Sequence, residues 1–138
     1  MKKVLPDTNI FIDWLNAGKY EDLLFVKGFT KYLSAVVLLE LEAGAFSQGD
    51  QRLVQKLAQG FKKAGRIVVP TDSDWQAGGR ILRRLQKEKG YQLSKARELV
   101  NDVLIAVSAR RIGAMVVTQN GKDFEAICNL YSFQLLIV

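Results

Sequence analysis

Histidine is missing from this 138-residue chain, and cysteine occurs only once. Without histidine, the commonest general acid and base and the commonest transition-metal ligand are both lacking. This absence excludes histidine-dependent ribonucleases, histidine-based zinc sites and Ser-His-Asp triads. The single Cys128 cannot form an internal disulfide, so the sequence carries no oxidised framework and a reducing cytoplasm fits it best.

Long apolar runs and linker-like segments are missing as well. No stretch reaches the length of roughly 18 apolar residues that a membrane helix requires, and the first residues do not resemble a signal peptide. We therefore expect a cytoplasmic protein without membrane contact. Repeats and Pro/Gly/Ser-rich linkers do not occur, and 49% of the residues are hydrophobic. We expect one domain over residues 1–138, with a single core.

The charge balance is moderately basic, with 20 Lys and Arg against 14 Asp and Glu. Such a balance suits a polyanionic partner, although it also serves solubility. Four of the cations recur at i, i+3, i+4 and i+7 and form one stripe on a predicted helix: Arg80, Arg83, Arg84 and Lys87. This basic stripe is either a solvated helix face or a surface for phosphate contacts.

Alternating strand and helix signals predict an α/β fold. Strands are expected near residues 3–6, 31–34, 66–70, 115–117 and in the C-terminal segment YSFQLLIV. Helices are expected over residues 8–16 with a stop at Gly18, over 36–46, 53–65 and 73–89, and from a Ser94 cap to residue 112 with a stop at Gly113. Strands separated by helices imply a mostly parallel five-stranded sheet covered on both faces, with ligands bound beyond the carboxyl ends of its strands.

Two acids directly precede or begin a predicted helix, one after a strand and the other after a turn. Asp7 follows the first strand and interrupts the apolar segment VLPDTNIFID, and Asp123 follows the turn at residues 120–121. Each can cap the helix that follows by accepting backbone N–H bonds, or can serve a catalytic site. Position alone leaves both interpretations open.

Two further acids lie inside apolar helical segments. Glu40 can belong to a solvated face that it shares with Glu42. Asp102 is harder to explain, because an ionised carboxylate in apolar surroundings is costly without a partner. Neither Arg97 nor Arg110 stands at the three- or four-residue spacing that would place it beside Asp102. The lack of an arginine at this spacing favours a functional role for Asp102.

Four motifs occur in order along the chain: DTN at 7–9, ELEAG at 40–44, NDVLIAVSA at 101–109 and TQNGKDF at 118–124. Together they resemble PIN-domain nucleases, most closely the small VapC-type toxins of type II toxin-antitoxin systems. One such motif is a weak signal, whereas four in this order make chance agreement improbable.

The resemblance implies a PIN-like three-layer fold and a metal-dependent endoribonuclease site at the carboxyl edge of the sheet. Its acidic quartet is matched by Asp7, Glu40, Asp102 and Asp123. Its supporting polar positions are Thr8, Asn9, Ser34, Thr118 and Asn120. Pro6 departs from the aliphatic residue expected there, and because proline lacks a backbone N–H we expect the first strand to end at it.

The chemistry of the quartet suits Mg²⁺ or Mn²⁺, which prefer oxygen ligands and need no histidine. We expect Asp7, Asp102 and Asp123 to bind the metal and Glu40 to orient a water. Attack by a metal-activated water would leave 5′-phosphate and 3′-hydroxyl ends. The resemblance also implies an RNA substrate, a small antitoxin protein as partner and a homodimer.

Other classes give alternative readings. A degenerate PIN module could bind RNA or a protein without cleaving anything. A phosphotransferase of the haloacid-dehalogenase kind needs a second acid where this chain has Asn9, and a receiver domain needs an adjacent acidic pair before its first helix. Neither of these last two patterns is present.

Overall fold

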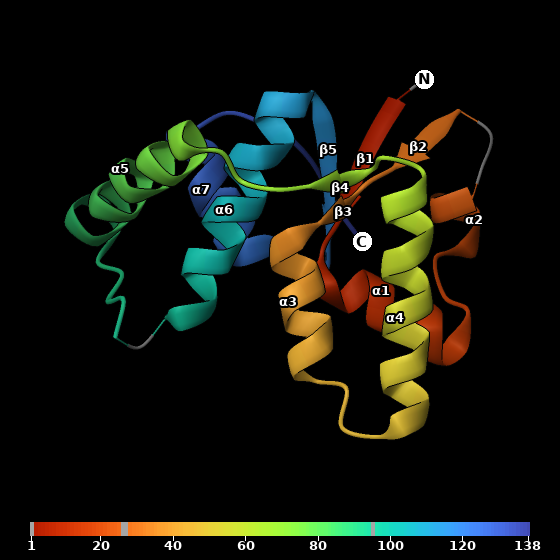
Figure 1. Cartoon of the computed structure of the whole chain (residues 1–138). Helices are drawn as coiled ribbons and strands as arrows, with labels where there is room; N and C mark the ends of the chain where they lie inside the picture. The colour runs from red at the N-terminus through yellow and green to blue at the C-terminus, as the bar shows by residue number, and fades with distance from the viewer. Residues whose placement is uncertain (1, 26–27, 95) are drawn as a thin grey trace.

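The computed structural model describes residues 2–25, 28–94 and 96–138 (Figure 1). Strands and helices alternate along most of the chain, as the sequence pattern predicts. In chain order they are β1 (Lys2–Pro6), α1 (Thr8–Ala17), α2 (Glu21–Phe25), β2 (Phe29–Lys31), β3 (Leu33–Ser34), α3 (Ala35–Ala43), α4 (Gln48–Lys63), β4 (Ile67–Val68), α5 (Asp72–Lys89), α6 (Arg97–Ile112), β5 (Ala114–Thr118), α7 (Gly121–Leu130) and β6 (Gln134–Ile137).

The main sheet has four parallel strands in the order β2-β1-β5-β6, and β3 and β4 form a separate parallel pair. The expectation of five strands in one sheet is therefore wrong. The expected strand at 31–34 divides at Tyr32, whose N–H donates to Val4 O at 2.9 Å. The N–H of the next residue, Leu33, donates instead to Arg66 O at 2.9 Å. The chain thus leaves β1 at this point and pairs with the segment around β4.

Alternate residues of the central strands face two different helix layers. Val4, Met115 and Val117 pack in one cluster with Ile10 of α1 and Leu24 of α2. Their neighbours on the strands belong to a larger cluster that contains residues of α3, α5, α6 and α7. This division follows from the two-residue period of a strand and gives both faces of the sheet an apolar cover. The expected three-layer α/β fold is confirmed.

Several element ends agree with the sequence signals. Gly18 and Gly113 end α1 and α6 in the left-handed conformation, at φ 66° and 71°. β1 ends at Pro6, as expected of a residue without a backbone N–H. Among the described helices, none combines the length and hydropathy that a bilayer crossing requires.

The expected Ser94 cap is wrong. The N–H of Ala96 donates to Leu93 O at 3.3 Å, so the chain makes a turn before the helix starts. α6 then begins at Arg97, and Ala96 at its N-cap supplies no side-chain hydrogen bond. The short helix α2 was not expected either, because five residues are too few to show a hydrophobic period.

Candidate active site

Asp7 directly follows the carboxyl end of β1 and has the capping role considered for it. Its Oδ1 accepts a hydrogen bond from Thr8 N at 2.8 Å and so caps α1. Its Oδ2 accepts from Thr118 Oγ1 at 2.8 Å, at the end of the neighbouring strand β5. The side chain is buried. Capping therefore uses one oxygen, while the second turns the carboxylate towards the residues that follow β5.

Thr118 and Asn120 join three of the acids in one hydrogen-bond chain. Thr118 is fully buried, and its Oγ1 also accepts from Asn120 N at 2.9 Å. The Asn120 side chain donates through Nδ2 to Asp102 Oδ2 at 3.1 Å and to Asp123 Oδ2 at 3.3 Å. Thr118 and Asn120, two of the expected supporting residues, therefore hold three of the carboxylates in place through hydrogen bonds.

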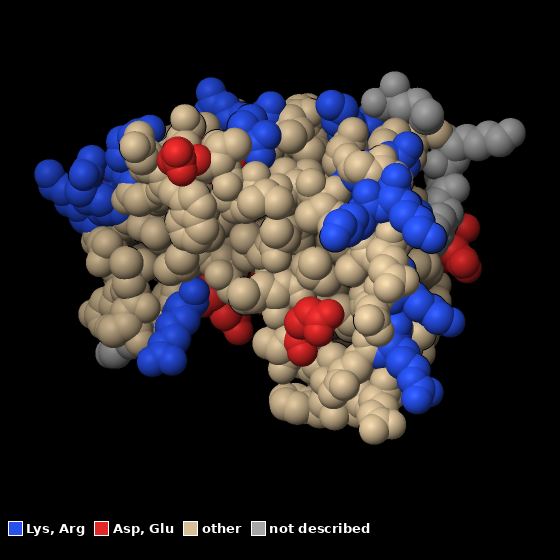
Figure 2. Space-filling model, in the orientation of Figure 1, with Lys and Arg blue, Asp and Glu red and all other residues tan. Residues whose placement is uncertain are grey.

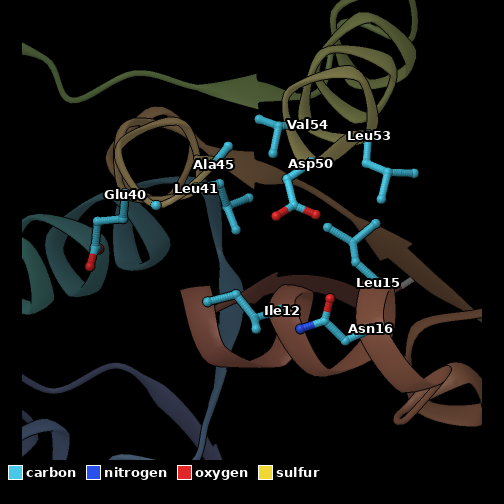
Figure 3. Close-up of a pocket in the computed structure, with 10 residues that line it drawn as sticks. Ile12, Leu15, Asn16, Glu40, Leu41, Ala45, Asp50, Leu53 and Val54 are labelled. Carbon is cyan, nitrogen blue, oxygen red and sulfur yellow. The ribbon is translucent and has the colours of Figure 1, made fainter. Parts of the chain in front are cut away.

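Glu40 reaches the same region from α3. Its Oε1 accepts from Thr8 Oγ1 at 3.1 Å, and its side chain is half-buried, whereas Glu42 is exposed. Glu40 also stands at the rim of a hollow of about 140 Å³ between α1, α3 and α4. In Figure 3 its carboxylate points away from the other lining residues, whereas Asp50 points into the hollow. The described contacts thus assign Glu40 to the group of acids.

Burial and mutual repulsion dominate the electrostatics of this group. The pKa of Asp102 is raised from 3.8 to about 8, first by burial and then by the charges of Asp7, Asp123, Glu40 and Glu98. Burial also raises the pKa of Asp7 and of Glu40. Neither ion pair between described residues, Arg84–Glu88 and Arg111–Asp74, involves these acids. Those carboxylates of the group that are ionised consequently have no ion-pair partner among the described residues.

The acids do not form a ready-made metal cage. Within residues 2–25, 28–94 and 96–138, no three acidic side chains stand close enough together to hold an ion directly. Their oxygen atoms are nevertheless the donors that Mg²⁺ and Mn²⁺ prefer, and Mg²⁺ keeps several of its waters when it binds. The donor chemistry and the lack of an ion-pair partner among the described residues fit a hydrated divalent ion, whereas the spacing does not fit a closed, all-protein site.

Two residues at the site were missed in the sequence. Tyr91, between α5 and α6, donates from its hydroxyl to Asp123 Oδ1 at 3.0 Å. No sequence signal connects a loop tyrosine with an acid 32 residues later. Glu98 contributes to the raised pKa of Asp7, Glu40 and Asp102. Its position four residues before Asp102 on α6 was a signal that could have revealed it.

The remaining predicted residues have other surroundings. Asn9 is exposed on α1. Ser34 is buried, and its Oγ accepts from Val36 N at 3.1 Å, so that it caps α3. Asp123 does not cap α7, which starts at Gly121, but lies in the first turn of that helix.

The basic stripe on α5 is exposed, and Figure 2 shows Lys and Arg side chains gathered over this helix. Arg84 is committed to a contact within the protein, because its Nε lies 2.6 Å from Glu88 Oε2 and its guanidinium also donates to Leu130 O at 3.3 Å. The acids of the candidate site come from other elements, namely β1, α3, α6 and α7. The stripe and the acids are thus on different elements, although α5 packs against α6 and α7.

Known proteins resemble this chain along almost its whole length. The PIN domain model matches residues 4–130. A chain in the structure of VapBC2 from Rickettsia felis, bound to a DNA fragment from their promoter, is 27% identical, with coverage of 99% of this chain and 98% of that chain and a TM-score of 0.70. A chain of VapBC-1 from nontypeable Haemophilus influenzae is 23% identical, with coverage of 98% of this chain and 97% of that chain and a TM-score of 0.69. A chain of VapBC-5 from Mycobacterium tuberculosis is 22% identical, with coverage of 100% of both chains and a TM-score of 0.64. No curated protein matches with significance. Because the family model covers most of its length, the chain belongs to the PIN domain family.

Proposed function

We propose that this protein is a divalent-metal-dependent endoribonuclease and the toxin of a VapBC-type pair. One observation carries the proposal: Thr118 and Asn120 hold Asp7, Asp102 and Asp123 at one edge of the sheet without a compensating cation among the described ion pairs. Concentrated, partly desolvated carboxylates cost stability. A cation that binds among these carboxylates, together with a polyanionic substrate, would offset this cost.

We propose a task for each of these side chains from its hydrogen bonds. Thr118 keeps Asp7 oriented, and Asn120 keeps Asp102 and Asp123 at a common donor. We assign Asp7, Asp102 and Asp123 as the metal-binding residues. A bound Mg²⁺ or Mn²⁺ would supply Lewis-acid chemistry, lowering the pKa of water and shielding the phosphate charge.

Glu40 is the candidate for orienting the attacking water. Thr8 occupies one of its carboxylate oxygens, and the half-buried side chain keeps a raised pKa. A carboxylate with a raised pKa accepts a proton more readily at neutral pH, which suits a group that holds and deprotonates water. Attack by water on phosphorus would leave 5′-phosphate and 3′-hydroxyl ends.

The similar structures support the proposal of a protein partner. VapBC-5 is by name a member of the VapBC family of toxin-antitoxin systems, and VapBC2 and VapBC-1 share the VapBC name. We propose a small antitoxin protein as the partner of this chain, with an Arg or Lys that faces the acids, and a homodimer acting on RNA in the cytoplasm. A monomer in light scattering at micromolar concentration would count against the dimer. If no antitoxin-like reading frame lies beside the gene, this would count against the proposed antitoxin partner.

The decisive experiment measures cleavage of single-stranded or looped RNA with Mg²⁺ or Mn²⁺ and again with excess chelator. Asp7→Asn should lower the rate by orders of magnitude, while the amide oxygen keeps the α1 cap and the circular dichroism spectrum. Glu40→Gln should also reduce cleavage strongly, and Glu42→Gln on the exposed side of α3 is the matched control. End mapping of the products checks the 5′-phosphate.

Undiminished cleavage in chelator would refute metal dependence. RNA binding without any cleavage would instead favour the non-catalytic PIN module.

A further inference from the structure

Gln119 stands between two residues that hold the acids of the candidate site. Thr118 donates to Asp7, and Asn120 donates to Asp102 and Asp123. The side chain of Gln119 is exposed beside this buried network. A nucleotide with its phosphate at the acids would therefore bring a base within reach of this part of the chain.

The side-chain amide of Gln119 is held in one orientation. Its Nε2 donates to Asp13 Oδ2 at 2.6 Å and to the Tyr20 hydroxyl at 2.7 Å. An ionised carboxylate only accepts hydrogen bonds, so the nitrogen of the amide must face Asp13. Both N–H groups are used in this way. The carbonyl oxygen Oε1 is consequently directed away from Asp13 as a fixed acceptor.

Tyr20 reaches Gln119 from an unusual backbone conformation. Its φ is 63°, the only positive value at a non-glycine residue in the described part of the chain. This region is unfavourable for a tyrosine, by roughly 1–2 kcal/mol. The ring also packs against the small cluster that contains Val4 and Ile10, which helps to hold it there. Strain of this kind is found at sites where a side chain must keep a defined position.

We infer that Gln119 determines specificity by reading the base next to the scissile phosphate through its carbonyl oxygen. The acceptor selects a base that carries an exocyclic amine over uracil. Cytosine offers the N4 amine at the position where uracil offers the O4 carbonyl, and two facing carbonyl oxygens repel each other. Asp13 and Tyr20 are the positioning residues, because the orientation that they give to the Gln119 amide decides whether cytosine or uracil is preferred. This inference rests on the proposed ribonuclease function.

The test uses RNAs that differ only by C or U at each position beside a mapped cut, with Mn²⁺. Wild-type protein should cleave the C form faster by about tenfold at one position, as expected of one hydrogen bond gained or lost. Gln119→Leu should remove the preference at that position. Gln76→Leu, at an exposed glutamine of α5, is the matched control and should keep it.

Asp13→Lys provides the sharper variant. The new ammonium donates, so Oε1 of Gln119 should turn towards it and present Nε2 to the base. The preference should then invert in favour of U. The added positive charge strengthens phosphate contacts equally for both RNAs, so the C/U ratio is independent of it. Asp13→Asn, whose amide can meet either end of Gln119, should reduce the ratio without inverting it.

A binding arm separates failure of this inference from failure of the proposed function. A pool with C or U at every position is selected for binding in chelator, where no cleavage is expected, and is then sequenced. Enrichment of C at one position that Gln119→Leu abolishes supports the inference even if no RNA is cleaved. A wild-type pool without such enrichment, or enrichment that survives Gln119→Leu, would overturn it, even for a protein that cleaves RNA.

Discussion

Thr118 Oγ1 donates a 2.8 Å hydrogen bond to Asp7 Oδ2 across 111 positions of the chain. The bond is possible because β1 and β5 are parallel neighbours, with Pro6 opposite Val117, so that their carboxyl ends meet. The backbone N–H of Asp7 donates to Val117 O at 2.8 Å and extends this pairing by one residue. The position of the first acid therefore depends on the sheet as well as on its own strand.

Thr118→Val should disturb both stability and catalysis. The change removes the donor to Asp7 and the acceptor for Asn120 N in a fully buried position. Leaving such groups unpaired costs about 1–3 kcal/mol, which urea denaturation would measure. Cleavage should fall together with stability. Thr118→Ser keeps the hydroxyl and should restore most of both, so equal losses in the two variants would contradict this role.

Stability without metal should fall as pH rises towards 8. The folded protein keeps a proton on Asp102 up to a pKa of about 8, whereas the unfolded chain releases it near 3.8. The folded state therefore binds more protons in this window, and the stability that this proton provides is lost as pH rises through the folded pKa. Denaturation in chelator at pH 5 and pH 8 measures the loss. Asp102→Asn should flatten the dependence, although the raised pKa of Asp7 and Glu40 leaves part of it.

Metal should reverse the order of melting temperatures of the wild type and Asp102→Asn. At neutral pH in chelator, the variant should melt at or above the wild type, because its folded state does not need the proton that Asp102 must take up on folding. Its amide oxygen can still accept from Asn120. Saturating Mn²⁺ should stabilise the wild type by binding only its folded state, and the variant less. If the variant melts several degrees lower in chelator, Asp102 has a structural role and its metal-binding assignment must be withdrawn.

Tyr91→Phe should weaken the proposed metal site while leaving the fold intact. The phenol donates one hydrogen bond to Asp123 from a half-buried position, so its loss should cost about 0.5–1.5 kcal/mol. The freer Asp123 should lower the apparent affinity for Mn²⁺ several-fold, measured as the metal concentration that gives half-maximal cleavage. Tyr131→Phe, which keeps the ring beneath Arg110, is the control. Unchanged metal dependence in Tyr91→Phe would contradict the positioning role.

Charge reversal at Arg80 and Arg83 tests the basic stripe. Both residues are exposed on α5, whereas Arg84 is paired with Glu88. If they contact phosphates, RNA affinity should fall equally for all sequences, and the logarithmic salt slope should decrease by about 0.7 for each lost contact. The cleavage pattern should persist. Reversal of the charges of exposed Arg52 and Lys62 on α4 is the matched control. If the variant with reversed Arg80 and Arg83 keeps the salt slope of the wild type, the stripe is a solvated face.

Local signals in the sequence predict features that local physics controls. Gly18 and Gly113 end their helices because glycine adopts positive φ without strain, and Pro6 ends β1 because it lacks a donor. The two-residue and 3.6-residue periods predict the layers. The apolar surroundings of Asp102 likewise indicate that its charge needs an explanation. Each of these inferences depends on a residue and its near neighbours in the chain.

Only the tertiary structure decided where the chain changes partners and how the acids meet. The division at Tyr32, which leaves four strands in the main sheet, depends on the competing backbone groups of Val4 and Arg66. The contact of Tyr91 with Asp123 and the pKa of Asp102 depend on groups from separate elements. Composition alone cannot show these relationships, because burial and through-space repulsion exist only once distant segments pack together. The sequence by itself determined which carboxylates the chain carries, and the fold determined which of them share a hydrogen-bond donor and repel one another.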